Sequence, residues 1–168
     1  MTTSLLEDAF AHHVWATDRL LASCADLTPE QLAATAPGTY GSILDTLHHL
    51  VDSDRWYLTF FRDSVRDFDT DAADVDEMRA QMADNGRLWK QVLASDPDPD
   101  TDIDEREDGT VLHSPVGVRL AQVVHHGTDH RSHVCTVLTT LGIEPPGIDV
   151  WDYARASGRE RFEEESPA

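Results

Sequence analysis

Two histidines four residues apart, His126 and His130, have the spacing best suited to shared chemistry in this sequence. They lie in a long segment with helical apolar periodicity, where residues at positions i and i+4 project from one face. Two imidazoles on one face can share a transition-metal ion, and an upstream segment carries His48 and His49. One nitrogen from that segment would complete a three-histidine site with an open position, which is typical of catalytic metal centres.

The helical angle separates the two upstream histidines, because successive helical residues turn by about 100°. His49 falls at the flank of the apolar stripe, in line with Trp56 and Phe60, whereas His48 falls on the opposite flank. The pattern therefore predicts half-buried, aromatic surroundings for His49 and a solvent-facing position for His48.

The same angle orders the histidines of the downstream segment. His130 lies inside its apolar stripe, His126 lies on the edge of the stripe beside His133, and His125 falls on the polar side. We therefore predict that His49, His126 and His130 bind the metal. His133 is the alternative ligand.

Two known metal-binding motifs of helices do not fit this segment. It reads His-Gly-Thr-Asp-His and not His-Glu-x-x-His, so the general base of a metalloprotease is missing. The Glu-x-x-His pairs of carboxylate-rich di-iron bundles are absent as well. A ligand set of three imidazoles suits zinc, nickel, copper or ferrous iron.

Four long helices are predicted to position these histidines. They cover Ser4 to Cys24, Ser42 to Ser64, Asp74 to Ser95 and Pro115 to Leu141. A short capped helix is expected to begin at Thr28. The residues predicted to face the core from the first and third long helices are Leu5, Leu6, Phe10, Val14, Leu20, Leu21, Met78, Met82, Leu88, Val92 and Leu93. This pattern predicts an all-α four-helix bundle, whose interior is a usual place for metal sites.

Residues 103 to 114 break the helical period. Asp108-Gly109 between two short alternating runs predicts a β-hairpin around a type I′ turn, inserted before the last long helix. Gly142 is placed to cap that helix, and a short element is expected over Asp149 to Ala156. We assign residues 1–158 to the bundle domain and residues 159–168 to a charged, flexible tail.

Composition narrows the function classes. The 168 residues include 32 acidic and 13 basic ones, and the net charge of −19 disfavours nucleic acid and anionic lipid as partners. No apolar run is long enough to span a membrane and the N-terminus does not resemble a signal peptide, so we expect a cytoplasmic protein. Cys24 and Cys135 lack metal-ligand spacing and are expected to be reduced, buried and non-catalytic. The acidic surface fits either a high-GC genome or salt adaptation.

Four stretches resemble the DinB-like superfamily of damage-inducible bundle proteins, which includes thiol-dependent S-transferases and maleylpyruvate isomerases. Trp15-Ala-Thr-Asp-Arg-Leu-Leu resembles the family's first-helix Trp-Ala-Asn-x-Arg-Leu-Leu, and the stretch that begins at Gly41 resembles its second-helix ligand segment. Val124-His-His-Gly-Thr-Asp-His-Arg resembles the fourth-helix Asn-His-x-x-x-His-Arg, and the stretch that begins at Leu141 resembles the tail that follows.

The resemblance implies an up-down-down-up four-helix bundle, commonly a homodimer, in which His49, His126 and His130 hold one divalent ion, zinc first and nickel second. Two departures concern the ligands. His125 stands where the family has Asn, and His133 lies in the pair that replaces the family's Gly-Gln. Either histidine could join the site.

The leading hypothesis is a metal-dependent thiol transferase. Three neutral histidines leave a divalent ion its full charge, which lowers the pKa of a bound thiol or water. A small thiol of the mycothiol or bacillithiol type would then attack an electrophile beside an aromatic side chain, with the candidates Trp56, Phe60, Trp151 and Tyr153. A metal-hydroxide hydrolase and a non-catalytic, ligand-binding stress-response bundle are the alternatives.

Other polar residues have a simpler expected role. Arg131 could orient a substrate carboxylate, but a structural salt bridge is the favoured interpretation. Asp52 and Asp54 could support the ligands through hydrogen bonds, but solvated helix acids are the favoured interpretation. Three histidines without a partner at metal-ligand spacing are predicted to be surface or boundary residues: His12, His13 and His113.

Overall fold

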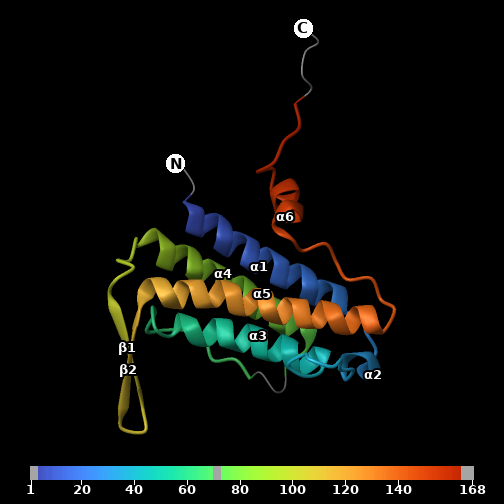
Figure 1. Ribbon diagram of the computed structural model, residues 1–168, viewed down its shortest axis with the longest axis horizontal. Helices are drawn as coiled ribbons and strands as arrows, with labels where there is room; N and C mark the ends of the chain where they lie inside the picture. The colour runs from blue at the N-terminus through green and yellow to red at the C-terminus, as the bar shows by residue number, and fades with distance from the viewer. Residues whose placement is uncertain (1–3, 70–72, 164–168) are drawn as a thin grey trace.

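The computed structural model describes residues 4–69 and 73–163 (Figure 1). Within these ranges the chain forms six helices and one two-stranded sheet. The elements are α1 (Leu5–Cys24), α2 (Pro29–Leu32), α3 (Ile43–Leu58), α4 (Val75–Ala94), β1 (Asp102–Glu107), β2 (Thr110–Pro115), α5 (Val116–Thr140) and α6 (Val150–Ala156). No helix of the described ranges is long and apolar enough to cross a membrane. The last residues of the predicted flexible tail, 164–168, lie outside the described residues.

The four long helices form the predicted bundle in up-down-down-up order. α1 and α3 each pack against both α4 and α5, so α1 and α3 lie diagonally opposite each other. The colour gradient in Figure 1 shows that α3 and α4 run one way and that α1 and α5 run the other way. The contact between α3 and α5 brings the two histidine-bearing segments side by side.

Side-chain caps mark the starts of three of the four long helices, and a glycine follows the end of the fourth. Ser42 accepts a hydrogen bond from the backbone of Asp45, and the Asp45 side chain accepts one from the backbone of Ser42, which forms a capping box at the start of α3. The same arrangement opens α1 and α4. After α5, Gly142 takes a φ of 74°, a left-handed conformation that favours glycine. The predicted caps at Ser42 and Gly142 are confirmed.

The end of α3 lies at Leu58, so the predicted end at Ser64 is wrong. The hydroxyl of Thr59 donates to the carbonyl of Trp56 at 2.7 Å, and the chain leaves the helix there. Phe61 still packs against the apolar cluster at this end of the bundle. Because Phe61 also packs inward, the apolar spacing in the sequence extends beyond the last helical residue.

The predicted hairpin is confirmed. β1 and β2 pair antiparallel with Glu107 opposite Thr110, which leaves Asp108 and Gly109 as a two-residue turn. Both turn residues have a positive φ, 46° and 78°, as a type I′ turn requires. The hairpin projects from the end of the bundle at which α5 begins (Figure 1).

Two apolar clusters fill the bundle, one toward each end. The first includes Leu20, Leu47 and Met82, and the second includes Phe10 and Trp89. Six of the predicted core residues are buried: Phe10, Leu20, Leu21, Met78, Met82 and Val92. Three more are half-buried: Val14, Leu88 and Leu93.

The prediction is wrong for Leu5 and Leu6, which are 92% and 46% exposed. Both lie in the first turn of α1, and the buried face of that helix begins only at Phe10. Trp89, which is fully buried, is a core residue that was not predicted from the sequence.

Candidate metal centre

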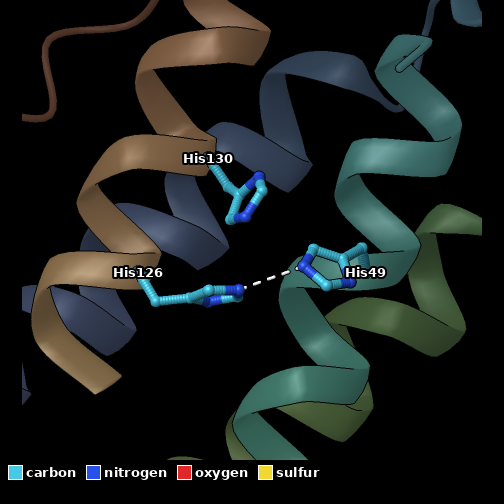
Figure 2. Close-up of side chains that lie close together, drawn as sticks. All are labelled: His49, His126 and His130. Carbon is cyan, nitrogen blue, oxygen red and sulfur yellow. Dashed lines mark hydrogen bonds between the residues drawn. The ribbon is translucent and has the colours of Figure 1, made fainter. Parts of the chain in front are cut away.

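His49 of α3 and the pair His126 and His130 of α5 point toward one another between the two helices (Figure 2). One ring nitrogen of each lies within 4.8 Å of the others. His49 Nε2 is 3.0 Å from His126 Nε2. The ring centroid of His130 lies 4.6 Å from that of His49 and 4.4 Å from that of His126. The structure therefore brings the three predicted ligands together, and we call them the histidine cluster.

Burial keeps the histidine cluster neutral. Desolvation first, and neighbouring histidines second, lower the pKa of His126 and of His130 from 6.5 to about 4. Desolvation also lowers the pKa of His49, against the opposing charge of Asp52. At neutral pH each of these rings therefore keeps a lone pair that can bind a metal.

The hydrogen bonding of the histidine cluster is incomplete. The short contact between His49 and His126 uses one nitrogen of each ring, and a neutral imidazole offers one donor and one acceptor. The buried Nδ1 of His130 has no hydrogen-bond partner among the described residues. The group of converging side chains contains no carboxylate. Neutral imidazoles with an unpartnered nitrogen suit zinc or nickel, so these residues fit the metal that the family resemblance implies.

Tyr40 borders the histidine cluster and was not identified from the sequence. Its ring stacks on that of His49 at 4.2 Å with an interplanar angle of 15°, and it meets the edge of His130 at 5.0 Å. It comes from the irregular segment before α3, where the hydroxyl of Thr39 donates to the carbonyl of Ala36 at 2.8 Å. Because this segment has no helical period, the sequence gives no signal for the position of Tyr40.

A second aromatic neighbour is Tyr57, whose ring centroid lies 6.0 Å from that of His126. The predicted residues Trp56 and Phe60 continue this aromatic surface: Trp56 lies 5.0 Å from Tyr57 and 4.7 Å from Phe60. Tyr57 follows His49 by two helical turns, so helical spacing could have identified it.

The aromatic residues of α6 lie elsewhere. α6 packs against α1 (Figure 1), and Tyr153 contacts His12 and Trp15 at centroid distances of 5.9 and 5.8 Å. Trp151 is 64% exposed. The prediction that Trp151 or Tyr153 borders the electrophile is therefore wrong for a reaction at the histidine cluster. The path of the connection after α5 determines where these two aromatic residues lie. The apolar periodicity of the sequence does not specify that path.

The other histidines of α3 and α5 take different positions. His48 is half-buried and its Nε2 lies 2.9 Å from the carbonyl oxygen of Ala73, so the prediction that it faces water is wrong. Ala73, just before α4, is the residue that contacts it. His125 is exposed, as predicted. His133 meets the ring of His130 edge-on at 5.4 Å but does not belong to the group of converging ligand atoms.

His13 is buried at the centre of the bundle, so its predicted surface or boundary position is wrong. It is 1% exposed, and its Nε2 lies 2.9 Å from Asp54 Oδ1. Arg131 Nη1, which can only donate, lies 3.1 Å from His13 Nδ1. Because Nδ1 must accept, Nε2 carries the proton and donates to Asp54. Trp89 Nε1 donates to both oxygens of Asp54, at 3.0 and 3.1 Å. We call these four residues the buried polar network.

The buried polar network positions α5 relative to α1 and α3. Arg131 directly follows the candidate ligand His130, and Asp54 lies on α3. A side chain at Gly127 would collide with the ring of His13, so glycine is needed where α5 meets α1. Arg131 thus contacts α1, and the favoured salt-bridge interpretation needs correction, because neutral His13 stands between Arg131 and Asp54.

The two acids predicted to be solvated differ from each other. Asp54 is buried in the network, so that prediction is wrong for it. Asp52 lies near the surface and pairs with Arg55 at 2.9 Å. The sequence pattern of α3 alone could not predict this difference, because the partners of Asp54 lie on α1 and α4.

The two cysteines are poor nucleophiles. Burial raises the pKa of the Cys24 thiol to about 11 and also raises that of Cys135. Cys24 is buried, as predicted, whereas Cys135 is half-buried, and both are free thiols. At neutral pH both thiols therefore stay protonated.

Comparisons with known proteins agree with this architecture. The sequence model of the DinB family matches residues 1–165. Among solved structures, the chain is similar to YfiT from Bacillus subtilis, described as a probable metal-dependent hydrolase with an unusual four-helix bundle topology. The TM-score is 0.63 at 17% sequence identity, over 86% of this chain and 91% of YfiT. The comparison with curated proteins gives no match.

Proposed function

The chain belongs to the DinB family, and from this premise we propose that it is a metal-dependent transferase that activates a low-molecular-weight thiol. His49, His126 and His130 would hold one divalent ion, zinc first and nickel second. The observation that supports this proposal is the convergence of three neutral imidazoles without a carboxylate. The thiol would be of the mycothiol or bacillithiol type.

The bound divalent ion would supply the positive charge that lowers the pKa of a thiol or water at the open position. The chain's own residues orient the ligands and shape the surroundings. Ser53 Oγ lies 3.4 Å from Nδ1 of His49, and the stacked ring of Tyr40 limits the rotation of His49. Tyr57 and the neighbouring Trp56 offer an aromatic surface for the electrophile.

The lack of a carboxylate among the converging ligand atoms favours a thiol over water. A carboxylate that could accept a proton does not belong to the histidine cluster, within the described part of the chain. A free thiol has a pKa of about 8.5, so it needs much less activation than water, whose pKa is about 15.7. A bound ion would therefore activate a thiol more readily than water, which supports the transferase proposal.

A hydrolase is the second candidate, because YfiT is described as a probable metal-dependent hydrolase. The same histidine cluster would then activate water and cleave an ester or amide. The two candidates share the metal and differ in the nucleophile, so one assay format separates them.

The test uses metal-loaded protein and 1-chloro-2,4-dinitrobenzene with mycothiol, bacillithiol, glutathione or coenzyme A, each in turn. Formation of a thioether conjugate that needs metal and is lost in His126→Ala supports the transferase. Metal-dependent hydrolysis of p-nitrophenyl acetate without thiol, and no conjugation, contradicts the transferase and supports the hydrolase. His125→Ala is the matched control on the same helix, because His125 is exposed.

We also propose a homodimer, which the family resemblance implies. Light scattering coupled to size-exclusion chromatography would show about twice the monomer mass of 18.7 kDa if the proposal is correct. A monomer at micromolar concentration would contradict it.

A further inference from the structure

The face of α5 turned away from the histidine cluster lines a crevice of about 750 Å³. α1, the segment that leads into α6 and α6 itself form its other walls, on the side of the bundle where Figure 1 shows α6. Most of its surface is apolar and comes from residues such as Ala9, Val124 and Ile148. Its volume lies within the usual range of small-molecule sites.

A buried guanidinium lines this crevice. Arg131 is 2% exposed. Its Nη1 donates to Nδ1 of His13 and to the hydroxyl of Thr17, both at 3.1 Å, and also lies 3.5 Å from the carbonyl oxygen of His13. Its Nη2 donates to the hydroxyl of Thr128 at 3.2 Å. All four acceptors are neutral. These contacts use three of the five N–H groups of a guanidinium, and the remaining two have no partner among the described residues.

The other buried arginine, Arg119, has the direct counter-charge that Arg131 lacks. Arg119 is 6% exposed and pairs directly with Glu105 at 2.9 Å. Arg131 has no carboxylate oxygen within ion-pair distance in the described ranges, and it reaches Asp54 only through the neutral ring of His13. This contrast occurs in a chain with 32 acidic residues. A buried cation without a direct counter-charge is costly, and a carboxylate can accept two parallel hydrogen bonds from one guanidinium.

We propose that this crevice binds a small apolar molecule with a single carboxylate, which pairs with Arg131 while the apolar part packs between α1, α5 and α6. The lining favours one negative charge over two, because Asp8 and Asp149 also face the crevice. Both are already engaged: Asp8 with Arg159, and Asp149 with the backbone N–H of Asp152 at the start of α6.

This site is separate from the proposed metal centre. Thr128, Arg131 and Cys135 line the crevice, whereas His126 and His130 lie on the opposite side of α5 and face α3. The inference therefore goes beyond the proposed function and does not depend on it.

The test measures binding of octanoate and of 1-octanol to the metal-loaded protein by isothermal titration calorimetry. We expect octanoate to bind at least about tenfold more tightly than octanol, because a charge-assisted hydrogen bond is roughly twice as strong as a neutral one. Equal affinities, or binding of neither probe, would overturn the proposal.

Two variants locate the binding. Ala9→Trp fills the crevice from α1 without changing Arg131 and should abolish octanoate binding, whereas Ala80→Trp on the exposed face of α4 should not change it. Arg131→Met should remove the preference for octanoate over octanol. His126→Ala should leave octanoate binding unchanged. Binding that survives Ala9→Trp, or that is lost in His126→Ala, would place octanoate elsewhere and overturn the proposal.

Discussion

His13 and the histidine cluster have opposite surroundings in this bundle. His13 lies between the two apolar clusters, and both of its ring nitrogens are engaged, one by Arg131 and one by Asp54. The histidine cluster lies between α3 and α5, where rings face rings and the buried Nδ1 of His130 has no partner in the described part of the chain. The same residue type is thus fully hydrogen-bonded in one region and under-bonded in the other.

The difference indicates which histidines are structural and which await a ligand. A buried imidazole with a carboxylate on one nitrogen and a donor on the other needs nothing more. Three neutral imidazoles that converge without a carboxylate have lone pairs to spare, and a metal ion would use them. Both regions contain buried histidine, so burial does not distinguish them. The number of ring nitrogens that have a hydrogen-bond partner does.

The largest effect on folding is expected from the structural region. Asp54→Asn removes the negative charge that accepts hydrogen bonds from His13 and Trp89. We expect it to lower the free energy of unfolding by about 3 kcal/mol, because a hydrogen bond to a charged group contributes about 1.5–3 kcal/mol. Asp52→Asn is the control, because its partly exposed pair with Arg55 should contribute less than about 1 kcal/mol. Chemical denaturation measures both. Equal effects of the two variants would mean that the buried polar network adds no more stability than a surface ion pair.

A smaller loss is expected at the contact between α5 and α1. Gly127→Ala places a methyl group against the ring of His13, and such overpacking costs about 1–3 kcal/mol. Ser132→Ala on the exposed face of the same helix should be nearly neutral. The melting temperatures of the two variants test this. A Gly127→Ala protein as stable as the wild type would mean that this contact does not fix the position of α5.

The histidine cluster should make the metal-free protein sensitive to pH. Because the pKa of His126 and of His130 is lowered from 6.5 to about 4, the unfolded chain binds more protons than the folded chain between these values. Stability is therefore full above pH 6.5 and falls as the pH drops toward 4. Partial exposure of the rings screens the effect, so we expect a smaller change than for Gly127→Ala.

Thermal melts of EDTA-treated protein between pH 7 and pH 5 measure this dependence. The double variant His126→Asn, His130→Asn should have a flatter profile than the wild type, since carboxylates contribute equally to both proteins. Identical slopes would contradict the assignment of lowered pKa values to the histidine cluster.

The smallest effect is expected at Tyr40. Loss of its stacking on His49 in Tyr40→Ala removes about 0.5–1.5 kcal/mol, which would lower zinc affinity by up to about tenfold. Tyr40→Phe keeps the ring and should bind zinc like the wild type. Competition with a chromogenic chelator measures both affinities. If Tyr40→Phe were as weak as Tyr40→Ala, the hydroxyl and not the stacking would matter.

Features that depend on residues close together along the chain could be predicted from the sequence. The start of α3 at Ser42 and the pairing of His126 with His130 depend on local spacing, and so does the turn at Asp108-Gly109. The choice of His49 over His48 also follows from the angle around a single helix. These predictions agree with the structure because neighbours along the chain decide them.

Features that depend on contacts between helices could not be predicted. The buried position of His13 requires Asp54 and Arg131 from two other helices. Tyr40 reaches the histidine cluster from an irregular segment, and Tyr153 lies against α1 because of the path that the chain takes after α5. No periodicity within a segment specifies these placements.

Elemental analysis of protein purified without a histidine tag, after incubation with zinc or nickel, tests the central claim most directly. We predict about one equivalent of metal in the wild type and in His13→Asn, and none in His126→Ala. No metal in the wild type, or a full equivalent in His126→Ala, would contradict a metal centre at His49, His126 and His130.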